Sequence, residues 1–261
     1  MNEQVIILVL STQLNDYDSF KQALRNTWLS DISSKNCRYF FYEGGHNCNE
    51  IDGDTIKLTE DDSLNGTYNK FVSALNVLDK SGISYECIYR TNLSSYIDVD
   101  KLLEFVSSVE NKADVIAAVV GKTYHLREKM YLRKFLRKLS IFGVFGKTIF
   151  FPSGSGFFIG KNFINELLSI GQVRGALIDD VMVGRLLNLK EKDITTLGRW
   201  DVIDFGHAYY RSSSTTKEPK VNLFHYRLKT KDRKFDYSLM YFLHDKNVRK
   251  KLVELGENYV P

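Results

Sequence analysis

The first 120 residues alternate strand-like and helix-like patterns, and this alternation constrains the fold more than any other feature of the chain. Residues 5–11 (VIILVLS) form a continuous apolar and β-branched run, as expected of a strand that is covered on both faces. Residues 16–31 then place Phe20, Leu24 and Trp28 at helical spacing. Further strands are predicted at residues 37–43, 85–91 and 114–120, and further helices at residues 67–82 and 99–109. The chain is therefore expected to have an α/β fold with a mostly parallel, doubly wound central sheet flanked by helices.

The second half of the chain follows this alternation less regularly. Residues 153–156 (SGSG) lie between two aromatic, strand-like flanks, and these four small residues predict a turn. The other segments are assigned as a loop at residues 44–54, a helix at the end of residues 150–171, a helix within residues 175–189 that starts near Asp179 and Asp180, and a last strand at residues 221–227.

Length and composition favour one compact domain over residues 1–261. With 43% hydrophobic residues the chain can bury a full core. Its three cysteines form no CxxC pair, and their odd number argues against a disulfide framework, which favours a reducing compartment. The N-terminal apolar run is short, and no segment reaches the roughly 18 consecutive apolar residues of a membrane helix. A soluble, cytoplasmic protein is therefore expected.

The basic residues are concentrated in one segment. The whole chain carries a net charge of +4, but residues 122–147 contain eight basic residues against one acidic residue. An apolar stripe that includes Met130, Phe135 and Leu139 gives residues 125–142 the pattern of a basic amphipathic helix. Such a helix would either contact an anionic membrane peripherally or pack one face on the domain. No recognition motif accompanies the charge, so nucleic acid is not an expected partner.

Four short motifs, in a fixed order, resemble those of one protein family. They are FKQALRNTW, where Arg25, Thr27 and Trp28 match, DSLNGTYNK, where Asp62, Ser63 and Lys70 match, FPSGSGFFIG at residues 151–160, and IDDVMVG at residues 178–184. The family is that of the inverting glycosyltransferases that include the β-1,3-galactosyl- and N-acetylglucosaminyltransferases and Fringe. The resemblance implies a GT-A fold with a Rossmann-like sheet, in which about residues 1–120 bind a nucleotide sugar and about residues 121–261 bind the acceptor.

This resemblance also implies a reaction and its substrates. The expected reaction moves a hexose or N-acetylhexosamine from a nucleotide donor, UDP by resemblance, to a hydroxyl group of a glycan or lipid-linked glycan. Because the chain shows no signal sequence or stem of the kind that Golgi members carry, a bacterial or viral cytosolic enzyme is expected.

The stretch TNLSS at residues 91–95 departs from the family pattern. Alignment of CIYRTNLSSYIDVDKLL with the family's YVLKTDDDVFVNVDNLL places Asn92, Leu93 and Ser94 on the aspartate triplet, which normally holds a divalent cation against the donor diphosphate. Neutral oxygen ligands bind Mg²⁺ or Mn²⁺ far less well than carboxylates do. His225 resembles the family's late histidine near the metal, but one histidine and a diphosphate make a poor site.

Three explanations of this departure compete. The enzyme needs no metal and uses basic side chains at the diphosphate, or it binds Mn²⁺ or Mg²⁺ weakly through Asp98 or Asp100, or it has lost catalysis and remains a nucleotide-sugar- or glycan-binding module. We favour the first explanation because the IDDVMVG motif is intact. The basic candidates are Arg25, Lys70, Arg90, Lys122 and Arg227.

An inverting transfer also needs a base that takes the proton of the acceptor hydroxyl group. Neighbouring residues on a helix point about 100° apart, so Asp179 and Asp180 cannot easily face the same atom. The resemblance makes Asp180 the base and leaves Asp179 to orient the acceptor or the local backbone. Both carboxylates equally suit a helix N-terminus, where they interact favourably with the helix dipole.

The remaining site residues are assigned by their positions. The donor-binding residues are expected to be Ser11, Thr12, Arg25, Asp62, Lys70, Arg90, Thr91, Asn92 and Ser94. The acceptor is expected to contact Ser153, Gly154, Ser155 and Gly156, because small residues allow the backbone to approach a ligand closely. A loop start at residues 11–12 and a plain turn at residues 153–156 remain equally simple alternatives.

Overall fold

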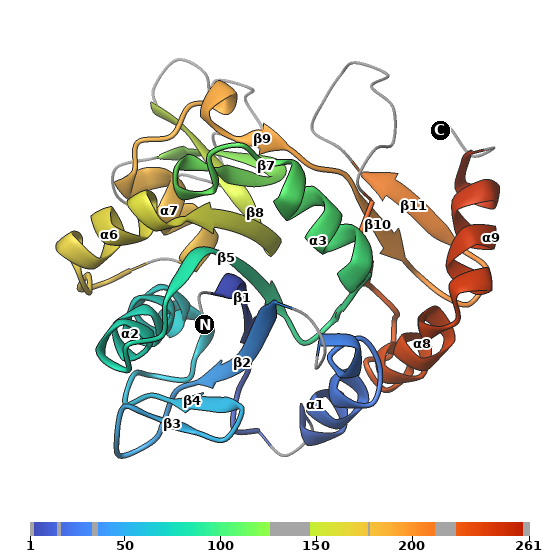
Figure 1. Cartoon of the computed structure of the whole chain (residues 1–261), viewed down its shortest axis with the longest axis horizontal. Coiled ribbons are helices and arrows are strands. Elements are labelled where there is room, and N and C mark those ends of the chain that lie inside the picture. Colours follow the sequence, from blue (N-terminus) through green and yellow to red (C-terminus); the bar gives the residue numbers. More distant parts are fainter. Residues whose placement is uncertain are drawn as a thin grey trace, which may run out of the picture.

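A computed structural model describes residues 3–14, 17–32, 36–125, 147–176, 178–211 and 223–257. Its centre is an eight-stranded sheet with the strand order β3-β4-β2-β1-β5-β8-β7-β9 (Figure 1). These strands are β1 (Glu3–Leu10), β2 (Cys37–Glu43), β3 (Glu50–Asp52), β4 (Thr55–Lys57), β5 (Tyr85–Asn92), β7 (Ile116–His125), β8 (Lys147–Gly160) and β9 (Thr195–Thr196).

Most strands of this sheet run in the same direction. β1 pairs in parallel with β2 and β5, and β2 pairs in parallel with β4. β8 is antiparallel to both β5 and β7, so β7 has the direction of β5, and β9 is parallel to β7. Only β3 and β8 oppose the others among the described strands. The predicted α/β class with a mostly parallel sheet is therefore confirmed.

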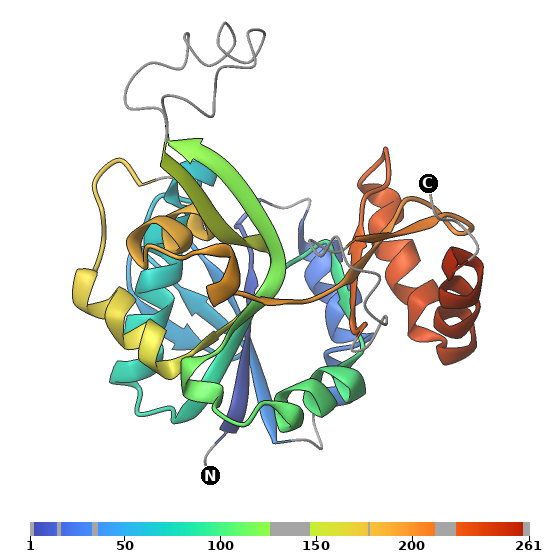
Figure 2. The same ribbon diagram turned by 90° about the horizontal axis from the view of Figure 1, so that it is seen from above.

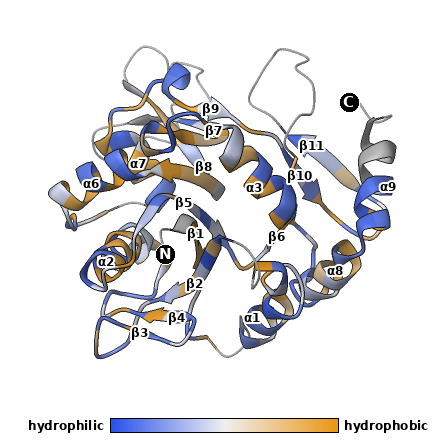
Figure 3. Ribbon diagram, viewed as in Figure 1, coloured by the Kyte–Doolittle hydropathy of each residue, from blue (hydrophilic) through white to orange (hydrophobic). Residues whose placement is uncertain are grey.

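Both faces of the central sheet are covered, which explains why β1 is apolar at consecutive positions. Val5 and Ile7 belong to one buried cluster, and Ile6 and Leu8 belong to another on the opposite face. The first cluster includes residues of α1 (Asp18–Arg25) and α3 (Val99–Ser108), and the second includes residues of α2 (Thr67–Lys80), α6 (Lys161–Ile170) and α7 (Asp179–Leu186). Figure 3 shows both hydrophilic and hydrophobic residues along these helices.

A smaller, four-stranded sheet with the order β11-β10-β12-β6 lies beside the central sheet (Figure 2). Its strands are β6 (Ser95–Ile97), β10 (Arg199–Val202), β11 (Ala208–Arg211) and β12 (His225–Leu228), and it is followed by α8 (Lys234–His244) and α9 (Lys246–Glu257). Trp200 and Tyr226 point into the buried apolar cluster that includes residues of α8. Alternate residues of a strand point to opposite faces, so Arg199, Asp201 and Arg227 lie on the other face of this sheet.

Two assignments made from the sequence are wrong. Residues 153–156 form no turn, because β8 runs through them as one 14-residue strand. Residues 44–54 are not all loop, because they contain β3, which pairs antiparallel with β4. Small and polar residues favour turns statistically, but here strand pairing of Gly156 with β5, and of β3 with β4, overrides that preference.

The predicted basic helix over residues 125–142 lies almost entirely outside the described residues. The last strand predicted at residues 221–227 is present as β12, which begins at His225. None of the helices in the described ranges is both long enough and apolar enough to cross a membrane.

Candidate functional site

The carboxyl end of β5 lies against the small residues of β8. The antiparallel register places Thr91 opposite Gly156. The Thr91 hydroxyl group donates a hydrogen bond to the Ser155 carbonyl oxygen at 3.0 Å, and the Asn92 side-chain amide donates to the Gly154 carbonyl oxygen at 3.3 Å. The pairing therefore brings TNLSS and SGSG together, although about 60 residues separate them in the chain.

Asn92 closes the turn that leaves β5. Its side-chain oxygen accepts hydrogen bonds from the Ser94 backbone nitrogen at 3.2 Å, the Ser94 hydroxyl group at 3.0 Å and the Ser95 hydroxyl group at 3.1 Å. Leu93, at the centre of the turn, is buried in the apolar cluster. A side-chain carbonyl oxygen has two lone pairs, so three donors already occupy the Asn92 oxygen. This turn is built as a hydrogen-bonded connection and does not fit a metal ion.

A buried ion pair holds the start of α7 against β5. The Asp179 carboxylate lies 2.6 Å from the Arg90 guanidinium group, and both side chains are almost completely buried. Arg90 also donates to the Tyr42 hydroxyl group at 3.2 Å and to the Gly154 carbonyl oxygen. Burial lowers the pKa of Arg90, but the charge of Asp179 and the contact with Tyr42 raise it by more, so Arg90 stays charged. The guanidinium group of Arg90 therefore already has hydrogen-bond and ion-pair partners within the protein.

Asp180 is held next to this pair by backbone nitrogens. Its carboxylate accepts hydrogen bonds from the Gly154 N–H group at 2.8 Å and from the Val181 N–H group at 2.8 Å. Burial raises the pKa of Asp180, and the charge of Asp179 raises it further, while Arg90 and the two N–H groups act in the opposite direction. A carboxylate offers about four lone-pair sites, so Asp180 can still accept a proton. A raised pKa makes it a stronger base.

Gly154 is required for this contact. A Cβ atom built on Gly154 would lie 2.7 Å from an Asp180 carboxylate oxygen. At Gly156 it would lie 2.3 Å from the Tyr89 hydroxyl oxygen and 2.8 Å from the His225 ring. The glycines of SGSG therefore allow side chains of three other elements to approach β8 closely.

Four predicted donor-binding residues form a second group, near the end of β1. Asp62 accepts hydrogen bonds from the Thr12 hydroxyl group at 2.6 Å and the Lys70 ammonium group at 2.8 Å. The Ser11 hydroxyl group donates to Glu43 at 3.1 Å. Burial raises the pKa of Asp62, but its hydrogen bonds from Lys70 and Thr12 lower it by more, so the group stays ionised. Lys70 is buried and neutralised by this carboxylate.

The two groups are connected through the first turn of α2. The Asp179 backbone nitrogen donates to the Thr67 hydroxyl group at 3.1 Å, and Lys70 lies one turn further along the same helix. The connection places the DSLNGTYNK, FPSGSGFFIG and IDDVMVG motifs at the same edge of the sheet. Ligands of open α/β sheets bind at this carboxyl-end edge.

The structure does not bring Arg25 to this edge. Arg25 makes a two-point ion pair with Asp54, at 2.8 and 2.9 Å, and its guanidinium group lies 5.0 Å from the centre of the Phe41 ring. Asp54 directly precedes β4, which is parallel to β2, so this ion pair lies toward the amino ends of these strands and away from the carboxyl-end edge. Arg25 therefore takes part in packing α1 against β2 and β4.

His225 lies near the Asn92 turn, but its surroundings do not suit a metal ion. Its Nε2 atom is 3.0 Å from the Ser95 hydroxyl oxygen. Burial, and then the positive charges of Arg199 and Arg227, lower the pKa of His225 to about 3. Within the described ranges, no three or more His, Cys, Asp and Glu side chains form a cluster that would hold a metal ion. A cation at His225 would meet two arginines and no described carboxylate cluster.

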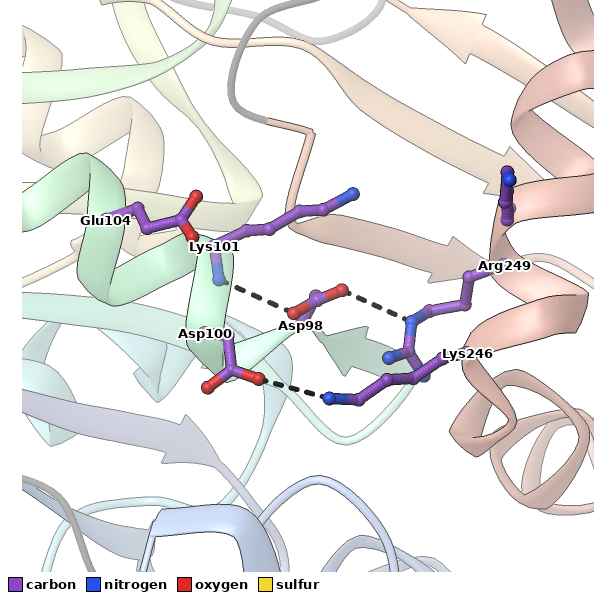
Figure 4. Close-up of a pocket in the computed structure, with 7 residues that line it drawn as sticks. Asp98, Asp100, Lys101, Glu104, Lys246 and Arg249 are labelled. Carbon is purple, nitrogen blue, oxygen red and sulfur yellow. Dashed lines mark hydrogen bonds and ion pairs between the residues drawn. The ribbon is translucent and has the colours of Figure 1, made fainter.

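Asp98 and Asp100, the alternative metal ligands, lie in a different place. They line a cavity of about 570 Å³ between α3 and α9 (Figure 4). Asp98 accepts a hydrogen bond from the Lys101 backbone nitrogen and lies 3.2 Å from Arg249, and Asp100 lies 3.5 Å from Lys246. Each carboxylate thus has a basic partner, and Asp98 caps α3.

Sequence reasoning missed Arg199 and Asp201. The Arg199 guanidinium group donates to the Ser153 hydroxyl group at 2.8 Å and to the Ser155 hydroxyl group, and it pairs with Asp201 at 2.8 Å. The segment RWDV at residues 199–202 alternates charged and apolar residues, which is the period-two pattern of a strand with one polar face. This alternation could have identified residues 199–202 as a strand with Arg199 and Asp201 on one face.

The chain was compared with family models, curated protein sequences and solved structures. No family model and no curated protein sequence matches the chain. A solved structure of the galactosyltransferase LgtC, in complex with donor and acceptor sugar analogues, aligns over 99% of this chain and 98% of that chain, with 9% identity and a TM-score of 0.46.

Proposed function

We propose that this protein is an inverting glycosyltransferase of the GT-A type that moves a sugar from a nucleotide donor to a hydroxyl group of a glycan or lipid-linked glycan. The observation that carries this proposal is Asp180, a carboxylate of raised pKa that two N–H groups hold at the carboxyl-end edge of the sheet. Perturbed carboxylates at such an edge are characteristic of acid–base sites.

The proposed step is one in-line displacement. The Asp180 carboxylate takes the proton of the acceptor hydroxyl group, and the acceptor oxygen forms a bond to the anomeric carbon of the donor sugar. The bond between that carbon and the diphosphate oxygen breaks, and the nucleoside diphosphate leaves with the electron pair. Asp179 does not serve as the base, because the Arg90 charge lies 2.6 Å away. It positions α7, and Asp180 with it.

The motif resemblance supports the same assignment. Three of the four motifs meet at one edge of the sheet, and the Arg90–Asp179 pair and the Gly154–Asp180 hydrogen bond join two of them. We place the donor along the ends of β1 and β5, beside Thr12, Asn92 and Ser94, and the acceptor beside residues 153–156. UDP is the proposed nucleotide because the resembling family uses it.

We further propose that the reaction needs no metal ion. The hydrogen-bonded Asn92 turn and the neutral His225 beside two arginines support this proposal. An inactive protein that only binds a nucleotide sugar or glycan is the competing possibility, because both Asp180 oxygens already accept hydrogen bonds within the protein.

Asp180→Asn separates the two possibilities. General-base catalysis contributes about 10²–10⁴-fold to rate, so the variant is expected to lose at least about a hundredfold in turnover with a panel of UDP-sugars and glycan acceptors, while UDP binding persists. Asp79→Asn, which changes an exposed aspartate on α2, is the matched control. Proton NMR of the product reports the anomeric configuration. Turnover of Asp180→Asn at the rate of the unchanged protein would rule out this base, and no turnover of any donor would favour the binding module.

A further inference from the structure

The polar face of the small sheet collects basic side chains around a single carboxylate. The register places Arg211 opposite Arg199 and places Arg227 opposite Asp201. Paired residues of neighbouring strands, and residues two apart in one strand, point to the same face. Lys229, which follows β12, reaches the same carboxylate. We call this set, Arg199, Asp201, Arg211, Arg227 and Lys229, the arginine face.

Its charges are not balanced. Asp201 lies 2.8 Å from Arg199, 2.5 Å from Arg211 and 2.9 Å from Lys229, so three cations share one carboxylate. The backbone of Arg227 pairs with β6 and β10, but its side chain makes no hydrogen bond or ion pair with any group in the described ranges. Within this set of described residues, four positive charges against one negative charge leave an excess of three.

Arg227 shows the effect of this imbalance. Burial lowers the pKa of Arg227, the charge of Arg199 lowers it further, and the charge of Asp201 only partly offsets them. The charges of Arg233 and Arg211 lower this pKa as well, although Arg233 also pairs with Asp236 at 2.8 Å. A partly buried guanidinium group among other cations is unfavourable without a counter-charge. The arginine face therefore has the composition of an anion site.

The arginine face also adjoins the proposed reaction centre. Arg199 donates to the hydroxyl groups of Ser153 and Ser155, which flank Gly154, the hydrogen-bond donor to Asp180. Arg227 lies opposite Ser95, whose hydroxyl group donates to the Asn92 side chain. Both arginines thus neighbour residues that contact the Asn92 turn.

Three of the other basic candidates already have a carboxylate partner. Arg25, Lys70 and Arg90 each pair with an internal carboxylate, at 2.8, 2.8 and 2.6 Å. We propose that the arginine face, with Arg227 as its principal contact, binds the diphosphate of the nucleotide-sugar donor and stabilises the leaving nucleoside diphosphate in place of a metal ion. Guanidinium groups suit this role because they donate two parallel hydrogen bonds to phosphate oxygens. This inference rests on the proposed function.

Calorimetric titration in EDTA tests the site with three probes: UDP, inorganic pyrophosphate and uridine. UDP should bind the unchanged protein more tightly than uridine, which lacks phosphates. Arg227→Gln should weaken binding of both UDP and pyrophosphate by about tenfold or more, as expected for the loss of charge-assisted hydrogen bonds. Uridine binding should stay unchanged, which also shows that the variant is folded. Arg174→Gln, an exposed arginine after α6, is the control and should bind like the unchanged protein.

Competition between probes identifies the source of the bound phosphate. Displacement of UDP by pyrophosphate supports a donor site. Pyrophosphate that binds without displacing UDP would indicate a site for a phosphate-bearing acceptor and overturn the assignment, as would equal UDP affinity in the unchanged protein and Arg227→Gln. If UDP binding depends on Arg227 but no sugar is transferred, the anion site stands and the transferase proposal fails. If transfer occurs and Arg227→Gln changes neither affinity nor kcat/KM, the anion site alone fails.

Discussion

The Asp180 carboxylate accepts a hydrogen bond from the backbone nitrogen of Gly154 at 2.8 Å, which joins the first turn of α7 to the middle of β8. The contact orients the proposed base, and it depends on the absence of a side chain at Gly154.

Gly154→Ala is expected to disturb the contact between α7 and β8. Its Cβ would lie 2.7 Å from the Asp180 carboxylate, so one of the two must shift. We expect a loss of about 1–3 kcal/mol in the free energy of unfolding, typical of overpacking, and a fall in turnover. Urea unfolding and a UDP-release assay measure both. Gly206→Ala, where the nearest atom is 3.8 Å from the added Cβ, is the control. Equal behaviour of the two variants would show that the close contact is unimportant.

Replacing only one residue of the Arg90–Asp179 pair should lower the free energy of unfolding substantially. Arg90→Met leaves a buried carboxylate without its cation, which destabilises proteins by about 3–5 kcal/mol. The double variant Arg90→Met/Asp179→Leu removes both charges and should recover much of that loss in urea unfolding. Lys161→Met, which breaks the exposed 3.5 Å pair with Asp79, should cost no more than about 1 kcal/mol. If the double variant is no more stable than the single one, the pair does not act as a unit.

His225 should make the fold sensitive to mild acid. Its pKa in the folded protein, about 3, is below the value of about 6.5 expected in the unfolded chain. Between these values the unfolded chain binds the additional proton, so the free energy of unfolding falls as pH decreases below about 6.5, by about 1.4 kcal/mol per pH unit.

Urea unfolding at pH 7.5 and pH 5.5 checks this dependence. His225→Asn should reduce the stability difference between the two pH values by about 1.4 kcal/mol, whereas the exposed His207→Asn serves as the control. The groups that face His225 are Arg199, Arg227 and Asp201, and none of them is changed. An unaltered pH dependence in His225→Asn would contradict the buried neutral ring.

Sugar transfer is expected to continue without metal. In the structure, Asn92, Ser94 and Ser95 form hydrogen bonds with one another. EDTA should therefore leave UDP affinity and turnover within about twofold of their values in Mn²⁺. Removal of an ion from a dedicated site would have a much larger effect, because such a site contributes several kcal/mol. Strict dependence on Mn²⁺ in both measurements would show that another set of ligands binds an ion.

The central sheet and its helices could be predicted well because each element shows its hydrophobic pattern within a short stretch of sequence. The run at residues 5–11 is apolar at successive positions, and the structure shows why, since Ile6 and Ile7 pack on opposite faces. The helix predicted at residues 67–82 is present as α2 (Thr67–Lys80), one helix with a nearly continuous buried side.

The rest depends on contacts that are distant in sequence. The small sheet consists of strands of three or four residues from three regions of the chain, so local patterns do not show which of them pair. SGSG suits a turn by composition, but it lies within β8, where Gly156 pairs with Thr91 of β5 and the register with β7 is irregular. Arg25 matches a family motif, yet Asp54, which the alignment did not include, determines where its side chain lies.

The turn at Asn92 has a mechanical consequence. β5 belongs to the central sheet and β6 to the small sheet, and only Leu93 and Ser94 separate them. Any hinge motion of one sheet against the other must bend the chain at this joint, where Asn92 ties both sides together and Leu93 anchors the middle in the core. Because Asn92, Leu93 and Ser94 carry no charge, nothing at this joint repels its neighbours, and its stiffness comes from hydrogen bonds and apolar packing within the chain.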